Sequence, residues 1–197
     1  MQTCPVDTLD TLAPDDSVVL HNTFNREAFI FPTHLDDLDP VCFDVVLGRN
    51  GSGGADGLEH VHPGSDETFL VRSGCLKVVI HGETHIVHER ESITIRRGAP
   101  HYFVNGHDRQ TEFSVIFDPP QQQRRFFANF AATTERRRQW FSTRGKPHFL
   151  LMALVLHTYR DHLYLAGRPV RLQKALFAVL APVARLLGYR LEIRPGR

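Results

Sequence analysis

Apolar and polar residues alternate in short stretches through the first 118 residues. A period of two residues is typical of β-strands that bury one face. Turns containing glycine separate these stretches at even intervals, which indicates an all-β sandwich or barrel. Pro119 and Pro120 end the last stretch, because proline cannot donate a hydrogen bond to a sheet. We predict strands at residues 18–20, 27–31, 41–47, 67–73, 76–80, 84–87, 92–95, 102–104 and 111–117.

The pattern becomes helical after residue 120. We predict one or two helices over 121–141 and further helices over 149–164 and 170–187. Pro182 should kink the last of these, and Gly188 should end it. The predicted organisation is therefore mainly β: a flexible N-terminal arm over 1–16, a β-barrel over 17–118 and an α-helical extension over 119–197.

The last predicted helix is amphipathic, with leucines on one side and Arg171, Lys174 and Arg185 among the polar positions. Such a helix needs an apolar partner. The favoured partner is the outside of the barrel or the same segment of a second subunit, so we expect a homodimer. An anionic membrane surface is a second option. DNA is a third and minor one, and we expect no nucleic-acid partner.

Composition places the chain among ordinary globular proteins, with 42% hydrophobic and 23% charged residues in a total of 197. No stretch contains the roughly 18–20 consecutive apolar residues that span a bilayer. The first 16 residues are acidic and contain no apolar run, which argues against a secretory signal. Three cysteines, an odd number without metal-binding spacing, favour a reducing compartment, and we expect a cytoplasmic protein.

The formal net charge of +1 conceals a strong asymmetry. Residues 1–120 contain 8 Lys and Arg against 19 Asp and Glu, a charge of −11, whereas residues 121–197 contain 15 against 3, a charge of +12. The basic part therefore faces either an external polyanion or the acidic part of this chain or of a second copy.

One segment carries a spacing that metal chemistry favours. His60 and His62 are two residues apart, so on a strand their imidazoles lie on the same face. A turn over 63–66 leads to Glu67, which would return beside the pair. His101, in a second strand and turn region, adds a third imidazole. Imidazoles combined with a carboxylate suit divalent iron, manganese, zinc, nickel or copper.

These residues resemble the motifs of the cupin superfamily. The first cupin motif has Gly, five residues, His-x-His, three or four residues, Glu, six residues and Gly, which here corresponds to a segment running from Gly54 to Gly74. In the second motif Gly98, His101 and Asn105 match, while Arg90 stands in place of a glycine and Arg96 in place of a proline. The helical tail also resembles extensions of some actinobacterial-type single-domain cupins.

The resemblance implies a double-stranded β-helix, or jelly roll, that binds a divalent metal ion (Fe²⁺, Mn²⁺, Zn²⁺, Ni²⁺ or Cu²⁺). The metal ligands that it implies are His60, His62, Glu67 and His101. Asp66 is an alternative to Glu67 if the shorter spacing applies, and the carboxylate that is not a ligand would face solvent. A dimer is the usual state of cupins of this size.

The neighbours of these residues predict a pocket with a metal at its floor and apolar walls. Phe69 and Val71 share a strand face with Glu67, and either Tyr102 or Phe103 should face the cavity. Such a pocket suits a small organic substrate with a polar handle. We therefore expect a metal-dependent enzyme, either a dioxygenase-like oxidoreductase or a Lewis-acid isomerase or cyclase. The alternative is a non-catalytic cupin that binds or senses a small ligand.

Overall fold

A computed structural model of the protein describes residues 17–32, 41–53 and 57–194. The N-terminal arm expected over 1–16 lies outside this described part, as does Gly54. Each predicted strand is present, most with bounds shifted by one or two residues. The strands are β1 (Ser17–Asn22), β2 (Glu27–Pro32), β3 (Val41–Leu47), β4 (His60–Val61), β5 (Asp66–Ser73), β6 (Cys75–Ile80), β7 (Glu83–His88), β8 (Ser92–Ile95), β9 (His101–Asn105), β10 (Thr111–Asp118) and β11 (Tyr164–Leu165).

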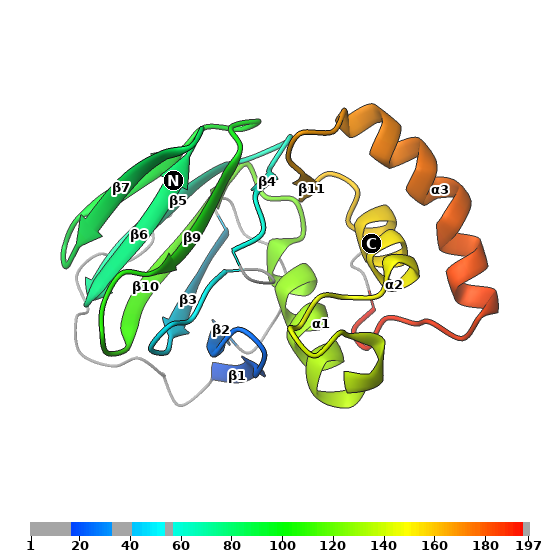
Figure 1. Ribbon diagram of the computed structural model, residues 1–197, viewed down its shortest axis with the longest axis horizontal. Helices are drawn as coiled ribbons and strands as arrows, with labels where there is room; N and C mark the ends of the chain where they lie inside the picture. The colour runs from blue at the N-terminus through cyan, green and yellow to red at the C-terminus, as the bar shows by residue number, and fades with distance from the viewer. Residues whose placement is uncertain (1–16, 33–40, 54–56, 195–197) are drawn as a thin grey trace.

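These strands form two antiparallel sheets in a jelly-roll arrangement (Figure 1). One sheet has the order β1-β2-β3-β10-β5-β8, and the other has the order β11-β4-β9-β6-β7. Alternate residues of each central strand are buried, as in β3, where Val41, Phe43, Val45 and Leu47 point inward. The inward side chains of both sheets join in one apolar core, whose burial drives folding of the barrel.

The helices are α1 (Gln123–Arg136), α2 (Phe149–Thr158) and α3 (Val170–Leu186), with a 3₁₀ turn η1 (Arg138–Trp140) after α1. Figure 1 shows α1 between the sheets and the pair formed by α2 and α3. Ala128 and Ala131 of α1 belong to the barrel core, whereas Phe126 packs with α2 and α3 in a second cluster. The fold is therefore mainly β with C-terminal helices, as predicted.

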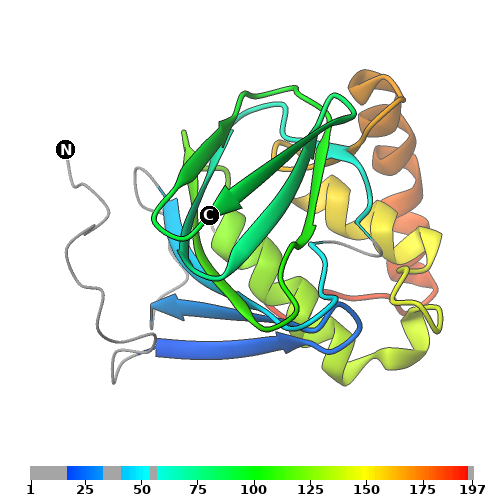
Figure 2. The ribbon, with the colours of Figure 1, turned by 60° about the vertical axis from the view of Figure 1, so that its left-hand side comes forward.

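The segment after α2 differs from the prediction of a helix over 149–164. The helix ends at Thr158, and the chain turns into β11, where Tyr164 and Leu165 pair with Val61 and His60 of β4. Tyr164 is fully buried. Burial of this ring and pairing with the open edge of β4 outweigh the local helical pattern. The extension thus completes the edge of the second sheet, next to the histidines (Figures 1 and 2).

The two departures from the second cupin motif have structural roles. Arg90 has φ +68°, a left-handed conformation that glycine adopts with least strain, which explains why a glycine is expected there. Arg96 replaces the proline and pairs with Asp66, with 2.8 Å between Nη1 and Oδ2. This ion pair joins the start of β5 to the turn that leads into β9.

Two further observations concern the helices and the cysteines. None of the helices in the described ranges has both the length and the apolar character that a membrane crossing requires. Cys42 is disulfide-bonded, and Cys75 is a free, buried thiol.

Candidate metal centre

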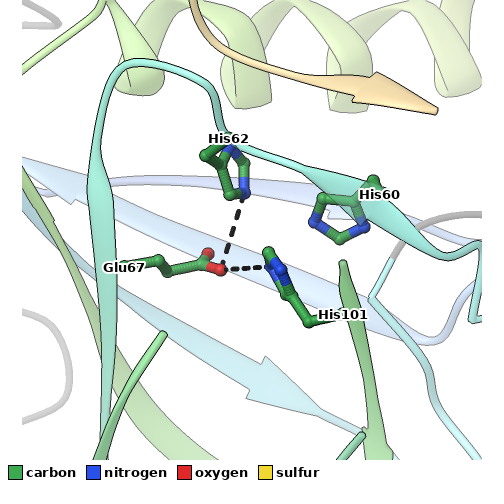
Figure 3. Close-up of side chains that lie close together, drawn as sticks. All are labelled: His60, His62, Glu67 and His101. Atoms are coloured by element: carbon green, nitrogen blue, oxygen red, sulfur yellow. Dashed lines mark hydrogen bonds and ion pairs between the residues drawn. The ribbon is translucent and has the colours of Figure 1, made fainter. Parts of the chain in front are cut away.

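His60 and His62 extend from β4 and from the turn that follows it. The register places His60 directly opposite His101 of β9, so cross-strand pairing brings these two imidazoles together. Their ring centroids are 4.3 Å apart, and those of His60 and His62 are 5.0 Å apart. The two-residue spacing of His60 and His62 and the pairing of β4 with β9 therefore bring three imidazoles together (Figure 3).

Glu67 enters this group from β5 in the other sheet. Its side chain is buried, on the same face as Phe69 and Val71, as the alternation predicts. Asp66 points the other way, where its carboxylate accepts hydrogen bonds from Arg96 Nη1 at 2.8 Å and from Arg97 Nε at 3.1 Å. The backbone N–H of Arg97 and both guanidinium groups lower the pKa of Asp66 to about 2. The structure thus brings Glu67 into the cluster and leaves Asp66 in a surface ion pair.

The four side chains converge on one point (Figure 3). One ligand atom from each of His60, His62, Glu67 and His101 lies within 4.8 Å of the others. Glu67 Oε2 is 2.8 Å from His101 Nε2 and 3.5 Å from His62 Nε2. All four residues are buried, with exposed fractions of at most 7%.

Backbone carbonyls orient all three imidazoles. His60 Nδ1 is 2.9 Å from the carbonyl of Leu58, and His101 Nδ1 is 2.9 Å from that of Ala99. His62 Nδ1 is 2.7 Å from the carbonyl of His162, which belongs to the extension. A carbonyl oxygen only accepts, so each Nδ1 carries the proton and donates it. This leaves Nε2 of each ring directed at the cluster, the nitrogen through which a metal-binding histidine of this orientation would coordinate.

The electrostatics favour a neutral His60 beside an ionised Glu67. Burial, together with His101 and His62, lowers the pKa of His60 to about 3. Burial alone would raise the pKa of Glu67, but His62 and His101 outweigh it and hold that pKa well below its usual range. Burial opposes protonation of His101 too, but its hydrogen bond to Glu67 raises its pKa.

This donor set fits a divalent metal ion. His62 Nε2 is buried and has no hydrogen-bond partner among the described residues, although an unpaired buried polar atom is costly. A cation at the convergence point would satisfy this nitrogen and balance the charge of Glu67. Three neutral imidazoles and one carboxylate are ligands that first-row transition metals accept.

A cavity of about 110 Å³ adjoins the cluster. One wall comes from the barrel and contains Glu27, Phe29, His60, Glu67 and Phe103. The opposite wall comes from the helical extension and includes Phe126, Phe127, Leu151, Met152, Val155 and Leu156. Of the two aromatic candidates, Phe103 lines the cavity, while Tyr102 is only half-buried.

Three contributions to this site escape prediction from the sequence. The carbonyl of His162 has no sequence signal, since every residue has a carbonyl and His162 lies 100 residues from His62. Glu27 begins a short strand and is remote in sequence from both motifs. The apolar residues of α2 predict a buried helix but not what it covers.

Comparison with known proteins identifies the region that contains both motifs. Residues 51–117 match the family described as the cupin domain. A search of curated proteins finds no match.

Among solved structures, the chain resembles a sugar phosphate isomerase of the cupin superfamily from Silicibacter pomeroyi, with 21% identity and a TM-score of 0.42 over 50% of this chain and 62% of that chain. It also resembles the polyketide cyclase RemF from Streptomyces resistomycificus, with 27% identity and a TM-score of 0.40 over 48% of this chain and 68% of that chain. A third similar structure is KdgF from Halomonas sp., with 15% identity and a TM-score of 0.42 over 51% of this chain and 86% of that chain. This chain therefore spans less than two thirds of the isomerase's length.

The matched region holds all four residues of the cluster within two sheets of the jelly-roll type. Residues 51–117 of this chain thus form a cupin domain.

Proposed function

We propose that this protein is a metal-dependent enzyme that binds one divalent first-row transition metal ion through His60, His62, Glu67 and His101. The observation that carries the proposal is the convergence of four buried donor atoms, with His62 Nε2 left without a hydrogen-bond partner among the described residues. A surface cluster of histidines would offer its nitrogens to water. Here the four donor atoms are buried away from water, and a cation is the partner that would bind all of them.

The chain's own residues prepare this centre before any ion binds. Three carbonyls accept hydrogen bonds from the Nδ1–H groups, so each ring is held in one orientation with Nε2 toward the cluster. Glu67 supplies one negative charge, which leaves a bound divalent ion with net positive charge. Such an ion would supply Lewis acidity if it is zinc, nickel or manganese, and reactivity toward dioxygen if it is iron.

The cavity supports a small organic substrate. Among the described residues that line it, only Glu27, His60 and Glu67 have ionisable side chains, and the others are apolar or glycine. Apolar walls exclude water and bind an apolar molecular body through burial of its surface. A substrate oxygen would face the end where His60 and Glu67 lie. The reaction classes that fit are oxygenation by a dioxygenase-like oxidoreductase and Lewis-acid isomerisation or cyclisation.

Metal binding is the first test of this proposal. We expect purified protein, stripped and reloaded, to bind one equivalent of a divalent metal in calorimetry and elemental analysis. The variant H60A/H62A should lose this metal and keep its circular dichroism spectrum, because the barrel has its own core. The variant H81A/H88A is the matched control, since both histidines are exposed on the β6–β7 hairpin, and it should bind metal normally. Full metal content in H60A/H62A would refute the site.

Turnover is the second test, and it separates the two proposed classes from the alternative. Loaded protein is assayed for oxygen consumption and for product formation with aromatic and diketone compounds. Oxygen consumption supports the oxidoreductase, and product without oxygen consumption supports the isomerase or cyclase. Stoichiometric metal without turnover supports a ligand-binding or sensor cupin, which the scarcity of proton-transfer groups in the cavity also favours.

A further inference from the structure

Glu27 lies in the wall of the same cavity, away from the metal centre. It is the first residue of β2, is 5% exposed and pairs in register with Leu47 of β3. Glu67 of β5 pairs with Phe117 of β10, and Phe117 pairs in turn with Val41 at the other end of β3. These two positions on β3 are about 20 Å apart along the strand. Figure 1 likewise shows the β1–β2 hairpin well separated from β4.

The surroundings of Glu27 favour a neutral carboxyl group. Asn22 Nδ2 donates to Glu27 Oε2 at 3.4 Å, and Asn25 provides a second hydrogen bond. Within the described ranges, no cation forms an ion pair with Glu27. Burial raises the pKa of Glu27 to about 8, against the opposing effect of these two amides. At neutral pH the group is therefore mainly a carboxylic acid, whose O–H can donate.

The cavity between the two polar ends is apolar. Phe29 and Phe103 line it on the barrel side, and Phe127, Met152 and Leu156 line it on the helical side. A buried carboxyl in such a place costs free energy unless a partner accepts its proton. The two amides that contact Glu27 donate to it, so these hydrogen bonds do not use its O–H.

We propose that the substrate is an elongated apolar molecule with a polar group at each end, and that Glu27 donates a hydrogen bond to the end remote from His60 and Glu67. This inference rests on the proposed metal-dependent function and specifies its substrate class. Glu27 acts as a binding and specificity residue, since it lies far from the metal centre. The acceptor that suits it is a carbonyl or ether oxygen.

The test uses alkyl hydroxamic acids of graded chain length, whose head group chelates metal ions. Each length is prepared with a plain methyl end, with a methyl ketone end and with an amine end. Calorimetry measures their dissociation constants for the metal-loaded wild type, E27Q and E27L. E27Q is nearly isosteric and keeps an N–H donor, whereas E27L replaces the donor by an apolar group of similar volume.

We expect the wild type to bind the ketone probe of the best length at least about tenfold more tightly than the plain probe, because a buried donor then gains its partner. E27Q should keep most of this preference, and E27L should lose it while binding the plain probe normally. Equal ketone preference in wild type and E27L would overturn the proposal. So would preference for the amine, which indicates an ionised Glu27, and so would failure of every probe to bind.

A second arm separates this inference from the metal proposal. Metal-free protein is titrated with a long methyl ketone and with a terminal alkene of the same length, neither of which needs a metal. If the protein takes up no metal and yet prefers the ketone in a way that depends on Glu27, the metal centre is refuted. The role of Glu27 as a polar contact is then supported. Metal binding without any effect of Glu27 refutes the present inference alone.

Discussion

The two walls of the cavity differ in kind. The barrel wall supplies all the residues with ionisable side chains among the described lining residues, including His60 and Glu67, on strands of two sheets. The wall formed by the extension is apolar, with side chains from α1, α2 and the segment leading to β11. The extension adds one polar contact to the metal centre, the carbonyl of His162 that accepts from His62 Nδ1 at 2.7 Å.

This difference shows a division of labour between the barrel and the extension. The candidate metal ligands are held by strand register, which fixes side-chain direction closely. The extension closes the site and sets its polarity, which needs apolar surface in the right place rather than particular functional groups. The extension should therefore matter for stability and substrate fit, and the barrel for metal affinity. Five predictions follow from that contrast, from the largest expected effect to the smallest.

Removal of residues 121–197 should abolish soluble, metal-binding protein. Phe127 packs against Phe29 and Phe43 of the barrel with ring centroids 5.3 and 5.2 Å apart, so the truncation exposes these rings to water. It also removes β11 from the edge of β4. Size-exclusion chromatography should show aggregates, and co-expression of residues 121–197 should restore solubility. A soluble, stable truncate would mean that the extension serves an external partner.

Glu67→Gln should lower metal affinity by at least about 100-fold, because the variant removes the one anionic donor of the cluster. Asp66→Asn is the matched control, with the same chemical change one residue away in the ion pair with Arg96 and Arg97. It should change metal affinity by less than about threefold, since surface ion pairs contribute little. Calorimetry with the chosen metal measures both. Equal losses in the two variants would contradict the assignment of Glu67.

Glu27 should make stability depend on pH. Its pKa is about 8 in the folded protein against 4.5 for a free side chain, so the folded state holds a proton that the unfolded state releases between these values. The free energy of unfolding should therefore fall as pH rises from about 4.5 to about 8, by an amount on the order of a few kcal/mol. Urea unfolding of the wild type and E27Q across this range measures the difference. Parallel pH curves for the two proteins would show that Glu27 is ionised throughout.

His162→Ala should distinguish the role of the His162 backbone carbonyl from that of its imidazole ring. The ring is 1% exposed and packs on Phe126, with centroids 4.2 Å apart, so its loss should lower the free energy of unfolding by about 2–3 kcal/mol. Metal affinity should stay within about threefold, because the carbonyl that holds His62 remains. His157→Ala, on the preceding helix and half-buried, controls for general loosening. A large loss of metal in His162→Ala would make the ring a part of the centre.

The outer face of α3 should influence association and hardly affect folding. Leu172, Val179 and Leu186 are 63%, 70% and 87% exposed, and this is where we expect the contact of the predicted homodimer. V179E/L186E should shift any dimer to monomer in light scattering and change the free energy of unfolding by less than about 0.5 kcal/mol. A wild type that is monomeric at all concentrations, or a variant that still dimerises, would exclude this face.

Much of the fold was predictable because its signals are local. Alternation located β3 and β8 with their full bounds, and proline and glycine marked most of the turns. The main error lies at 159–164, where the chain leaves α2 and turns into β11 instead of continuing the helix. Apolar residues such as Leu163 and Leu165 suit either state, and only the open edge of β4 decides between them.

For the candidate metal centre, too, local sequence patterns predict one part and long-range contacts decide the rest. The sequence by itself determined which residues could be ligands, since His60, His62 and Glu67 follow from strand period and one turn, and His101 from its resemblance to a second motif. It also placed Glu67 on the strand face of Phe69, but left Asp66 as the alternative ligand until the structure showed Glu67 buried.

Only the tertiary structure decided how these donors are oriented and what they face. The carbonyl of His162 contacts His62, which is 100 residues away in the sequence. Glu27 and Glu67 line one cavity, although they lie on different strands and align with opposite ends of β3. Contacts of this kind depend on how two sheets and three helices pack together. This packing depends on contacts between residues throughout the chain, so no short sequence pattern predicts it.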